Sequence, residues 1–121
     1  MTALIVHWGP AAAYAVGIFL LSHQSRLPMQ TWAPDILSHF LEYFFFASTL
    51  VWGMSRGLRV RLSPHKFALL GAVSIFYAVV DEFHQSFVPG RHASWADVAA
   101  DALGAAFGLA ACSLLQRRNP G

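Results

Sequence analysis

Carboxylates and imidazoles at helical spacing are the side chains of this sequence that could do chemistry. They fall in three segments, 35–42, 81–85 and 97–101, where most of them lie three or four positions apart and so share one face of a helix. An imidazole titrates near neutrality, and a carboxylate beside it completes a general acid and base pair. Gln85 would orient a bound molecule, and Arg91 would hold an anion such as a phosphate. The candidate catalytic residues are His39, Glu42, Asp81, His84, Gln85, Arg91, Asp97 and Asp101.

The same side chains also suit a metal ion. Imidazole nitrogens and carboxylate oxygens from His39, Glu42, Asp81 and His84 would form a ligand set for a divalent metal such as zinc. Their spacing does not match a known zinc signature, and the single cysteine, Cys112, lies in an apolar run. The sequence therefore leaves the cofactor open.

Structural roles compete with these chemical ones. Asp35 and Asp97 would each begin a helix, where a negative charge complements the helix dipole. A buried network of acids, histidines and Arg91 would also fix helix packing without any reaction. Glu82 is expected to face lipid headgroups or a loop. At this point a reactive site and a structural network both remain open.

The elements that must position these residues are apolar. Of the 121 residues, 56% are hydrophobic and only 12% charged, and the mean hydropathy is +0.49, which indicates an integral membrane protein. The sequence predicts one all-α domain, residues 1–121, because helices satisfy their own backbone hydrogen bonds in lipid. Prolines and glycines separate its segments. The predicted membrane-spanning helices are 3–22, which we expect to be retained rather than cleaved as a signal peptide, 35–54, 66–85 and 95–116.

Positive charges divide unevenly between the two ends of such a four-helix bundle. Of the eight Lys and Arg residues, only Arg26 and Arg91 fall in the first and third connections. The positive-inside rule then predicts that both termini are cytoplasmic. All six carboxylates fall toward the opposite, outer side, where burying them in a membrane needs a compensating role. The sequence thus predicts an outward-facing polar pocket. Because the net charge is only +2 and no basic cluster alternates with aromatics, nucleic acid is not expected as a partner.

A small-residue motif follows the acids of the fourth predicted helix. Asp97, Asp101, Gly104 and Gly108 form one stripe, and glycines four residues apart allow another helix to approach closely. We expect this stripe to face the bundle. The same motif would also serve a homodimer.

The segment 81–91, which reads Asp-Glu-Phe-His-Gln-Ser-Phe-Val-Pro-Gly-Arg, is followed by Asp97, Asp101 and Gly104. This pattern closely resembles the signature of the VanZ-like membrane proteins. Residues 35–43 resemble that family's second-helix element, although Ile36 stands where the family often has lysine.

The triplet Ser22-His23-Gln24 resembles the Ser-x-Gln element that follows the first helix in the VanZ-like family. On this resemblance we expect Ser22, Gln24 and Arg91 to bind substrate. The resemblance also implies a small polytopic membrane protein, and the founding member of the family is associated with low-level resistance to teicoplanin, a lipid-bearing glycopeptide antibiotic that acts outside the membrane.

These observations lead to one main hypothesis and two alternatives. The outward-facing pocket would bind or modify an amphiphilic cell-envelope or lipid-linked molecule, in a bacterial cytoplasmic (inner) membrane. If the protein is an enzyme, which the sequence does not decide, metal-assisted or acid/base hydrolysis of a lipid or cell-wall substrate fits these groups. The first alternative is a non-catalytic binding or interaction protein with a structural acid and histidine network. The second is a small transporter or proton pathway, disfavoured because the inner half carries few polar groups.

Overall fold

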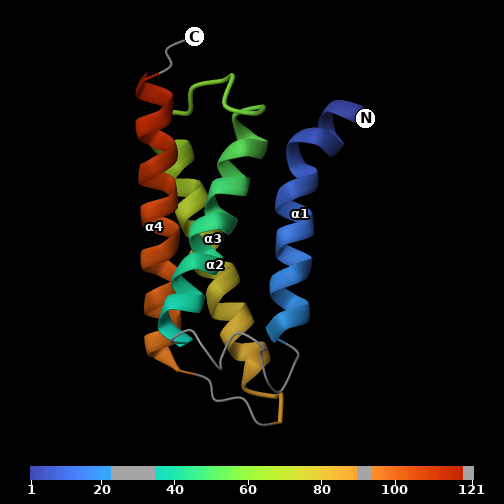
Figure 1. Ribbon diagram of the computed structural model, residues 1–121, viewed down its shortest axis with the longest axis vertical. Coiled ribbons are helices and arrows are strands. Elements are labelled where there is room, and N and C mark those ends of the chain that lie inside the picture. Colours follow the sequence, from blue (N-terminus) through green and yellow to red (C-terminus); the bar gives the residue numbers. More distant parts are fainter. Residues whose placement is uncertain (23–34, 90–93, 119–121) are drawn as a thin grey trace.

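The computed structural model describes residues 1–22, 35–89 and 94–118, and all regular structure in these ranges is α-helical. The helices are α1 (Thr2–Ser22), α2 (Asp35–Met54), α3 (Pro64–Gln85) and α4 (Trp95–Arg118). They run alternately up and down, as Figure 1 shows, and α2 contacts each of the other three. The all-α fold with four helices is confirmed.

Helix bounds differ from the expected ones by small extensions. The first turn of α3 begins at Pro64 rather than 66, because proline is tolerated at the start of a helix and Ser63 caps it. The Ser63 hydroxyl accepts a hydrogen bond from the backbone N–H of Lys66 at 3.3 Å. In addition, α1 begins one residue earlier, and α4 continues to Arg118 rather than 116.

Three of the described helical segments are long and apolar enough to cross a membrane: Thr2–Leu21, Pro64–Gln85 and Trp95–Arg118. Large apolar side chains on their outer faces, such as Phe76, are exposed rather than packed in the core. A surface of this kind suits lipid better than water. The chain therefore has the character of an integral membrane protein. Helix α2 is not among the segments that are both long and apolar enough to cross a membrane.

The closest helix contact joins α2 to α4 through two glycines. A Cβ atom added at Gly104 would lie 2.1 Å from the carbonyl oxygen of Phe40, and one added at Gly108 would lie 2.4 Å from that of Phe44. Only glycine allows the two backbones to approach this closely. The expectation that this stripe faces the bundle is confirmed, and the contact brings the polar residues of the two helices together.

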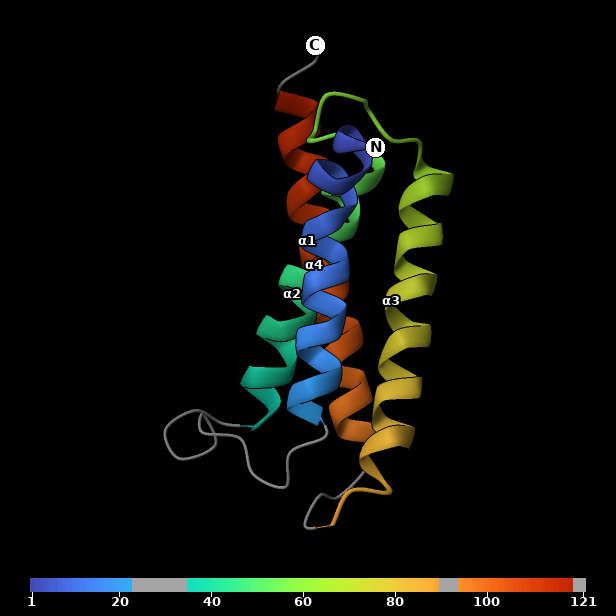
Figure 2. The same cartoon turned by 90° about the vertical axis from the view of Figure 1, so that its right-hand side faces the viewer.

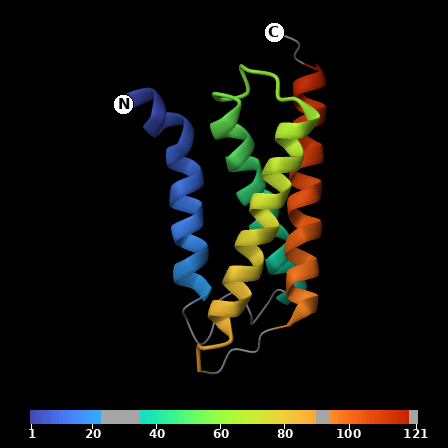
Figure 3. The same ribbon diagram turned by 180° about the vertical axis from the view of Figure 1, so that it is seen from behind.

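The other elements pack around this pair. Figure 2 shows α1 crossing in front of α4 and α3 at the side, and Figure 3 shows α3 from behind with α4 beside it. The Tyr77 hydroxyl of α3 donates a hydrogen bond to the Ala15 carbonyl of α1. At the far end of α4, the buried Gln116 side chain donates to the Val60 carbonyl at 2.9 Å and accepts from the Leu62 N–H at 3.1 Å. This side chain thereby fastens the connection between α2 and α3.

Candidate functional site

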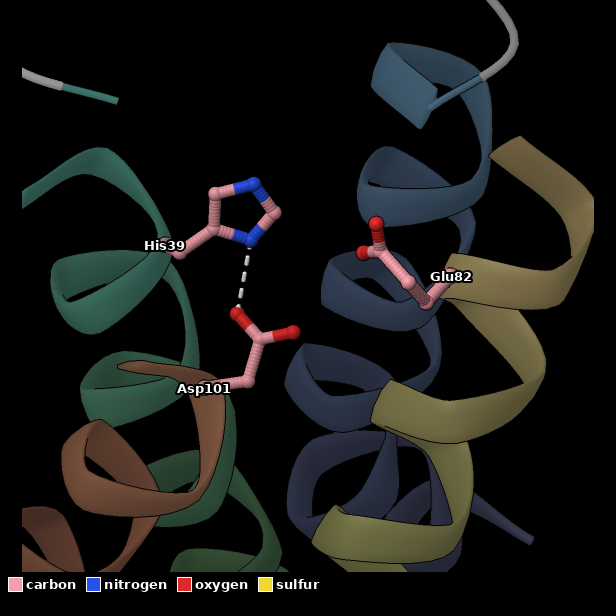
Figure 4. A group of neighbouring side chains, drawn as sticks. All are labelled: His39, Glu82 and Asp101. Carbon is pink, nitrogen blue, oxygen red and sulfur yellow. Dashed lines mark hydrogen bonds and ion pairs between the residues drawn. The ribbon is translucent and has the colours of Figure 1, made fainter. Parts of the chain in front are cut away.

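Three buried side chains from three helices meet at the end of the bundle where α2 and α4 begin and α3 ends. His39 comes from α2, Glu82 from α3 and Asp101 from α4, and they point toward one another (Figure 4). One ligand atom of each lies within 4.8 Å of the others. Their exposed fractions are 4%, 6% and 0%, respectively. We call these three residues the central cluster.

A short hydrogen bond joins two members of the central cluster. Nδ1 of His39 lies 2.8 Å from Oδ1 of Asp101, and a carboxylate can only accept, so Nδ1–H is the donor. On the other side of the ring, Nε2 lies 3.7 Å from Oδ2 of Asp97. The imidazole therefore lies between two carboxylates, an arrangement that orients a ring for proton transfer or for metal binding.

Glu82 occupies a different place from the one that its sequence context indicated. The expectation that it faces lipid headgroups is wrong, because its side chain is buried, although it does contact the loop. Oε1 accepts a hydrogen bond from the backbone N–H of Ser94 at 2.6 Å. Oε2 has no hydrogen-bond partner among the described residues. From the sequence, Asp81 rather than its neighbour Glu82 is the predicted site residue in this turn of α3. However, Glu82 and Gln85 are three positions apart and so also share a face of the helix. That spacing was the available signal.

Two further residues of α3 extend the polar site. Asp81 and Gln85 are buried, and Nε2 of Gln85 lies 3.4 Å from Oδ2 of Asp81. The fully buried Tyr43 of α2 lies close enough to interact electrostatically with the carboxylates of Asp81 and Asp101. Its hydroxyl has no hydrogen-bond partner among the described residues. Tyr43 was not a predicted site residue, because an aromatic side chain in an apolar run carries no distinguishing signal.

His84 and Glu42 lie toward α1 rather than in the central cluster. The half-buried ring of His84 stacks on Phe19 of α1, with ring centroids 4.7 Å apart. Glu42 is half-buried and lines a separate groove between α1 and α2, together with Tyr14. In the part of the chain that the structure describes, the only group of at least three histidine, cysteine or acidic residues that could hold a metal is the central cluster. The predicted ligand set shares only His39 with it.

Two of the three predicted substrate-binding residues lie outside the described ranges, and the third lies at the edge of one. Gln24 and Arg91 lie outside the described residues. Ser22 is the last residue of α1, and Asp35 is the first of α2, but their side chains are not described either. Their roles stay predictions.

An open groove between α3 and α4 reaches the central cluster from the side of the bundle. Its volume is about 250 Å³, and Glu82 lines it together with two serines. The remaining lining is apolar, and much of it faces outward, with Trp95 80% exposed. The groove thus presents an apolar wall beside a buried carboxylate. Its lining residues are Val79, Glu82, Phe83, Ser86, Ser94, Trp95 and Val98.

Apolar spanning helices and a buried cluster of acids and histidine near one end of the bundle define a class of small helical membrane protein. The chain belongs to the VanZ/LLP1 family, whose family model matches residues 11–116. This match confirms the resemblance drawn from segment 81–91. Searches of curated proteins and of solved structures each find no significant match.

Proposed function

We propose that this VanZ/LLP1 family protein binds or modifies an amphiphilic cell-envelope or lipid-linked molecule at the central cluster. The observation that carries the proposal is the position of Glu82. Its carboxylate belongs both to the buried polar cluster and to the lining of the apolar groove between α3 and α4. An amphiphile has the matching character, with an acyl chain for the apolar wall and a polar headgroup for the cluster.

Four membrane spans and an outward-facing cluster form part of this proposal. Although α2 is less apolar than its neighbours, it has 20 residues, enough to cross a hydrocarbon core of about 30 Å. Its His39 is buried against Asp101 and so would not meet lipid. The described Lys and Arg residues all lie in the connection between α2 and α3, at the start of α3 or at the end of α4. By the positive-inside rule, this distribution supports a cytoplasmic location for that end of the bundle and for both termini in a bacterial cell.

The proposed site would then lie in the outer leaflet of the cytoplasmic membrane. Cell-wall precursors, their polyprenyl carriers and the acyl chain of teicoplanin all meet at this surface. A pocket for one of these amphiphiles would account for the family's association with teicoplanin resistance. Acid/base hydrolysis at a headgroup would use the pair formed by His39 and Asp101.

Filling the groove tests whether it holds an amphiphile. Val98→Trp places a bulky ring in the groove. The control, Val73→Trp, places the same ring on the exposed face of α3, at a position that does not line the groove. We expect native mass spectrometry of protein purified from bacterial membranes to detect a bound amphiphile, enriched over bulk lipid, in the wild type and in Val73→Trp. Val98→Trp should lose it. Equal retention by both variants, or no enriched molecule in the wild type, would overturn the proposal.

One observation favours the second candidate, a non-catalytic protein with a structural network. The hydrogen bond between His39 and Asp101 joins α2 to α4 one turn from Gly104, where the helices are in closest contact. A pair in that position also stabilises the helix contact. Under this alternative no amphiphile is retained, and the cluster variants lose stability but no binding activity.

A further inference from the structure

Two carboxylate oxygens of the central cluster lack partners although their side chains are buried. Oδ2 of Asp101 and Oε2 of Glu82 make no hydrogen bond to any described residue. Asp101 is fully buried, and the exposed fraction of Glu82 is 6%. In Figure 4 the second oxygen of Asp101 points toward Glu82. A buried charged oxygen without a partner has lost its hydration and gained nothing in return, so something else is expected to satisfy these atoms.

We propose that His39, Glu82 and Asp101 bind a divalent transition-metal cation, with zinc or manganese the best match. The mixture of one imidazole and two carboxylates suits these ions, whereas sites for magnesium or calcium are built mainly from oxygens. The two negative charges of the carboxylates balance the charge of the ion. Among the described residues, no lysine or arginine pairs with Glu82 or Asp101, so the cation would fill that role.

The geometry fits an ion at Nδ1 of His39. Ligand atoms about 2.0–2.2 Å from one ion lie up to roughly 4.4 Å apart. One ligand atom of each of the three side chains lies within 4.8 Å of the others, and Nδ1 is the ring nitrogen next to Asp101, at 2.8 Å. Metal binding would replace the proton that Nδ1 now donates to Asp101. The ring's one remaining proton would then lie on the opposite nitrogen, Nε2, which faces Asp97 at 3.7 Å. A carboxylate behind a ligating histidine in this way orients the ring and raises its basicity.

Three protein ligands leave one position of a tetrahedral ion open. Because Glu82 also lines the groove between α3 and α4, the open position would lie next to the groove. An ion there would bind a phosphate or carbonyl oxygen of a headgroup, and this last step rests on the proposed function. The metal site itself does not rest on the proposed function. If the protein binds zinc in the absence of any amphiphile, the metal site is supported even when Val98→Trp has no effect on amphiphile binding.

Metal analysis of detergent-purified protein tests the site directly. After dialysis against metal-free buffer, samples are loaded with zinc or manganese alone, washed and analysed for metal content. We expect stoichiometric metal in the wild type and its loss in His39→Ala and Glu82→Gln. The matched control is His65→Ala, because His65 is an exposed histidine at the other end of the bundle. This variant should retain the metal. His84→Ala separates this ligand set from the one predicted from the sequence, and it should also retain the metal.

Two further measurements keep the test independent of misfolding. Gel filtration should show the Glu82→Gln variant at the same elution volume as the wild type. Cobalt(II) added in place of zinc should give visible absorption bands of a tetrahedral site in the wild type and not in Glu82→Gln. A wild type that holds no metal and gives no cobalt bands would overturn the proposal. So would a folded Glu82→Gln variant that binds metal as well as the wild type, or loss of metal in His84→Ala but not in Glu82→Gln.

Discussion

The imidazole of His39 on α2 donates a hydrogen bond of 2.8 Å to the carboxylate of Asp101 on α4, and neither side chain is accessible to solvent beyond a few per cent. The pair lies one turn from the point where Gly104 brings the backbones of the two helices together. Stability and the proposed function therefore depend on the same helix contact. This link makes the contact the first feature to test.

Gly104→Ala should destabilise the fold, whereas Gly17→Ala should not. A methyl group at Gly104 would meet a backbone oxygen at 2.1 Å, which a side-chain rotation cannot relieve, while the same group at Gly17 meets nothing within 4 Å. We expect a loss of about 1–3 kcal/mol or more at Gly104. At Gly17 the free energy of unfolding should be unchanged or rise by about 0.5–1 kcal/mol. Denaturant unfolding in detergent micelles measures both, and equal tolerance of the two changes would contradict the close helix contact.

The pair formed by His39 and Asp101 should behave as a coupled unit. His39→Leu leaves the fully buried Asp101 without the imidazole that hydrogen-bonds to it, and we expect it to cost about 3–5 kcal/mol of unfolding free energy. Adding Asp101→Leu removes the stranded charge and should restore part of that loss. A double-mutant cycle measured in the presence of a chelator gives the interaction free energy between His39 and Asp101 without a contribution from bound metal. Strictly additive effects would show that the two side chains do not depend on each other.

Gln116→Leu should loosen the connection between α2 and α3. The amide makes two hydrogen bonds to that connection, and losing them costs about 2 kcal/mol, which corresponds to roughly thirtyfold more frequent local opening. Trypsin cleavage at the exposed Arg59 and Arg61 reports this opening. The control is Ser113→Ala, less than one turn away on α4. Unchanged cleavage in Gln116→Leu would mean that the amide does not hold the connection.

Thiol labelling tests the proposed orientation. In a Cys112→Ala background, Ser63→Cys places a thiol at the end of the bundle that carries the described Lys and Arg residues, and Pro89→Cys places one at the opposite end; both positions are exposed. A membrane-impermeant maleimide applied to intact cells should label Pro89→Cys and spare Ser63→Cys until the cells are lysed. The reverse pattern would turn the central cluster toward the cytoplasm.

Hydropathy and helical spacing were enough to predict the four helices and the inward stripe of α4. Long apolar runs interrupted by proline and glycine mark the helices, and the glycine motif through Gly104 and Gly108 identifies the packed face. These features depend on local sequence alone. For the same reason the sequence alone predicts His39 and Asp101 as site residues.

The composition of the cluster could not be predicted in the same way. Asp81 and Glu82 are neighbours, and which of them reaches His39 depends on how α3 is rotated against α4. That rotation is set by side-chain packing between helices distant in sequence, and spacing along one helix does not specify it. His84 illustrates the same limit, because its ring stacks on Phe19 of α1. Tyr43 gave no signal, since only its neighbours make its hydroxyl a part of the site.

The most direct test of the central cluster as a functional site is the teicoplanin susceptibility of cells that express Glu82→Gln. The amide keeps the shape of the side chain but removes the charge that the cluster and the groove share. We expect the wild type to lower susceptibility relative to an empty vector. Glu82→Gln, present in the membrane at the same level, should give no protection. Full protection by Glu82→Gln would contradict the assignment of this cluster as the functional site, and a wild type that gives no protection would contradict the proposed role in resistance.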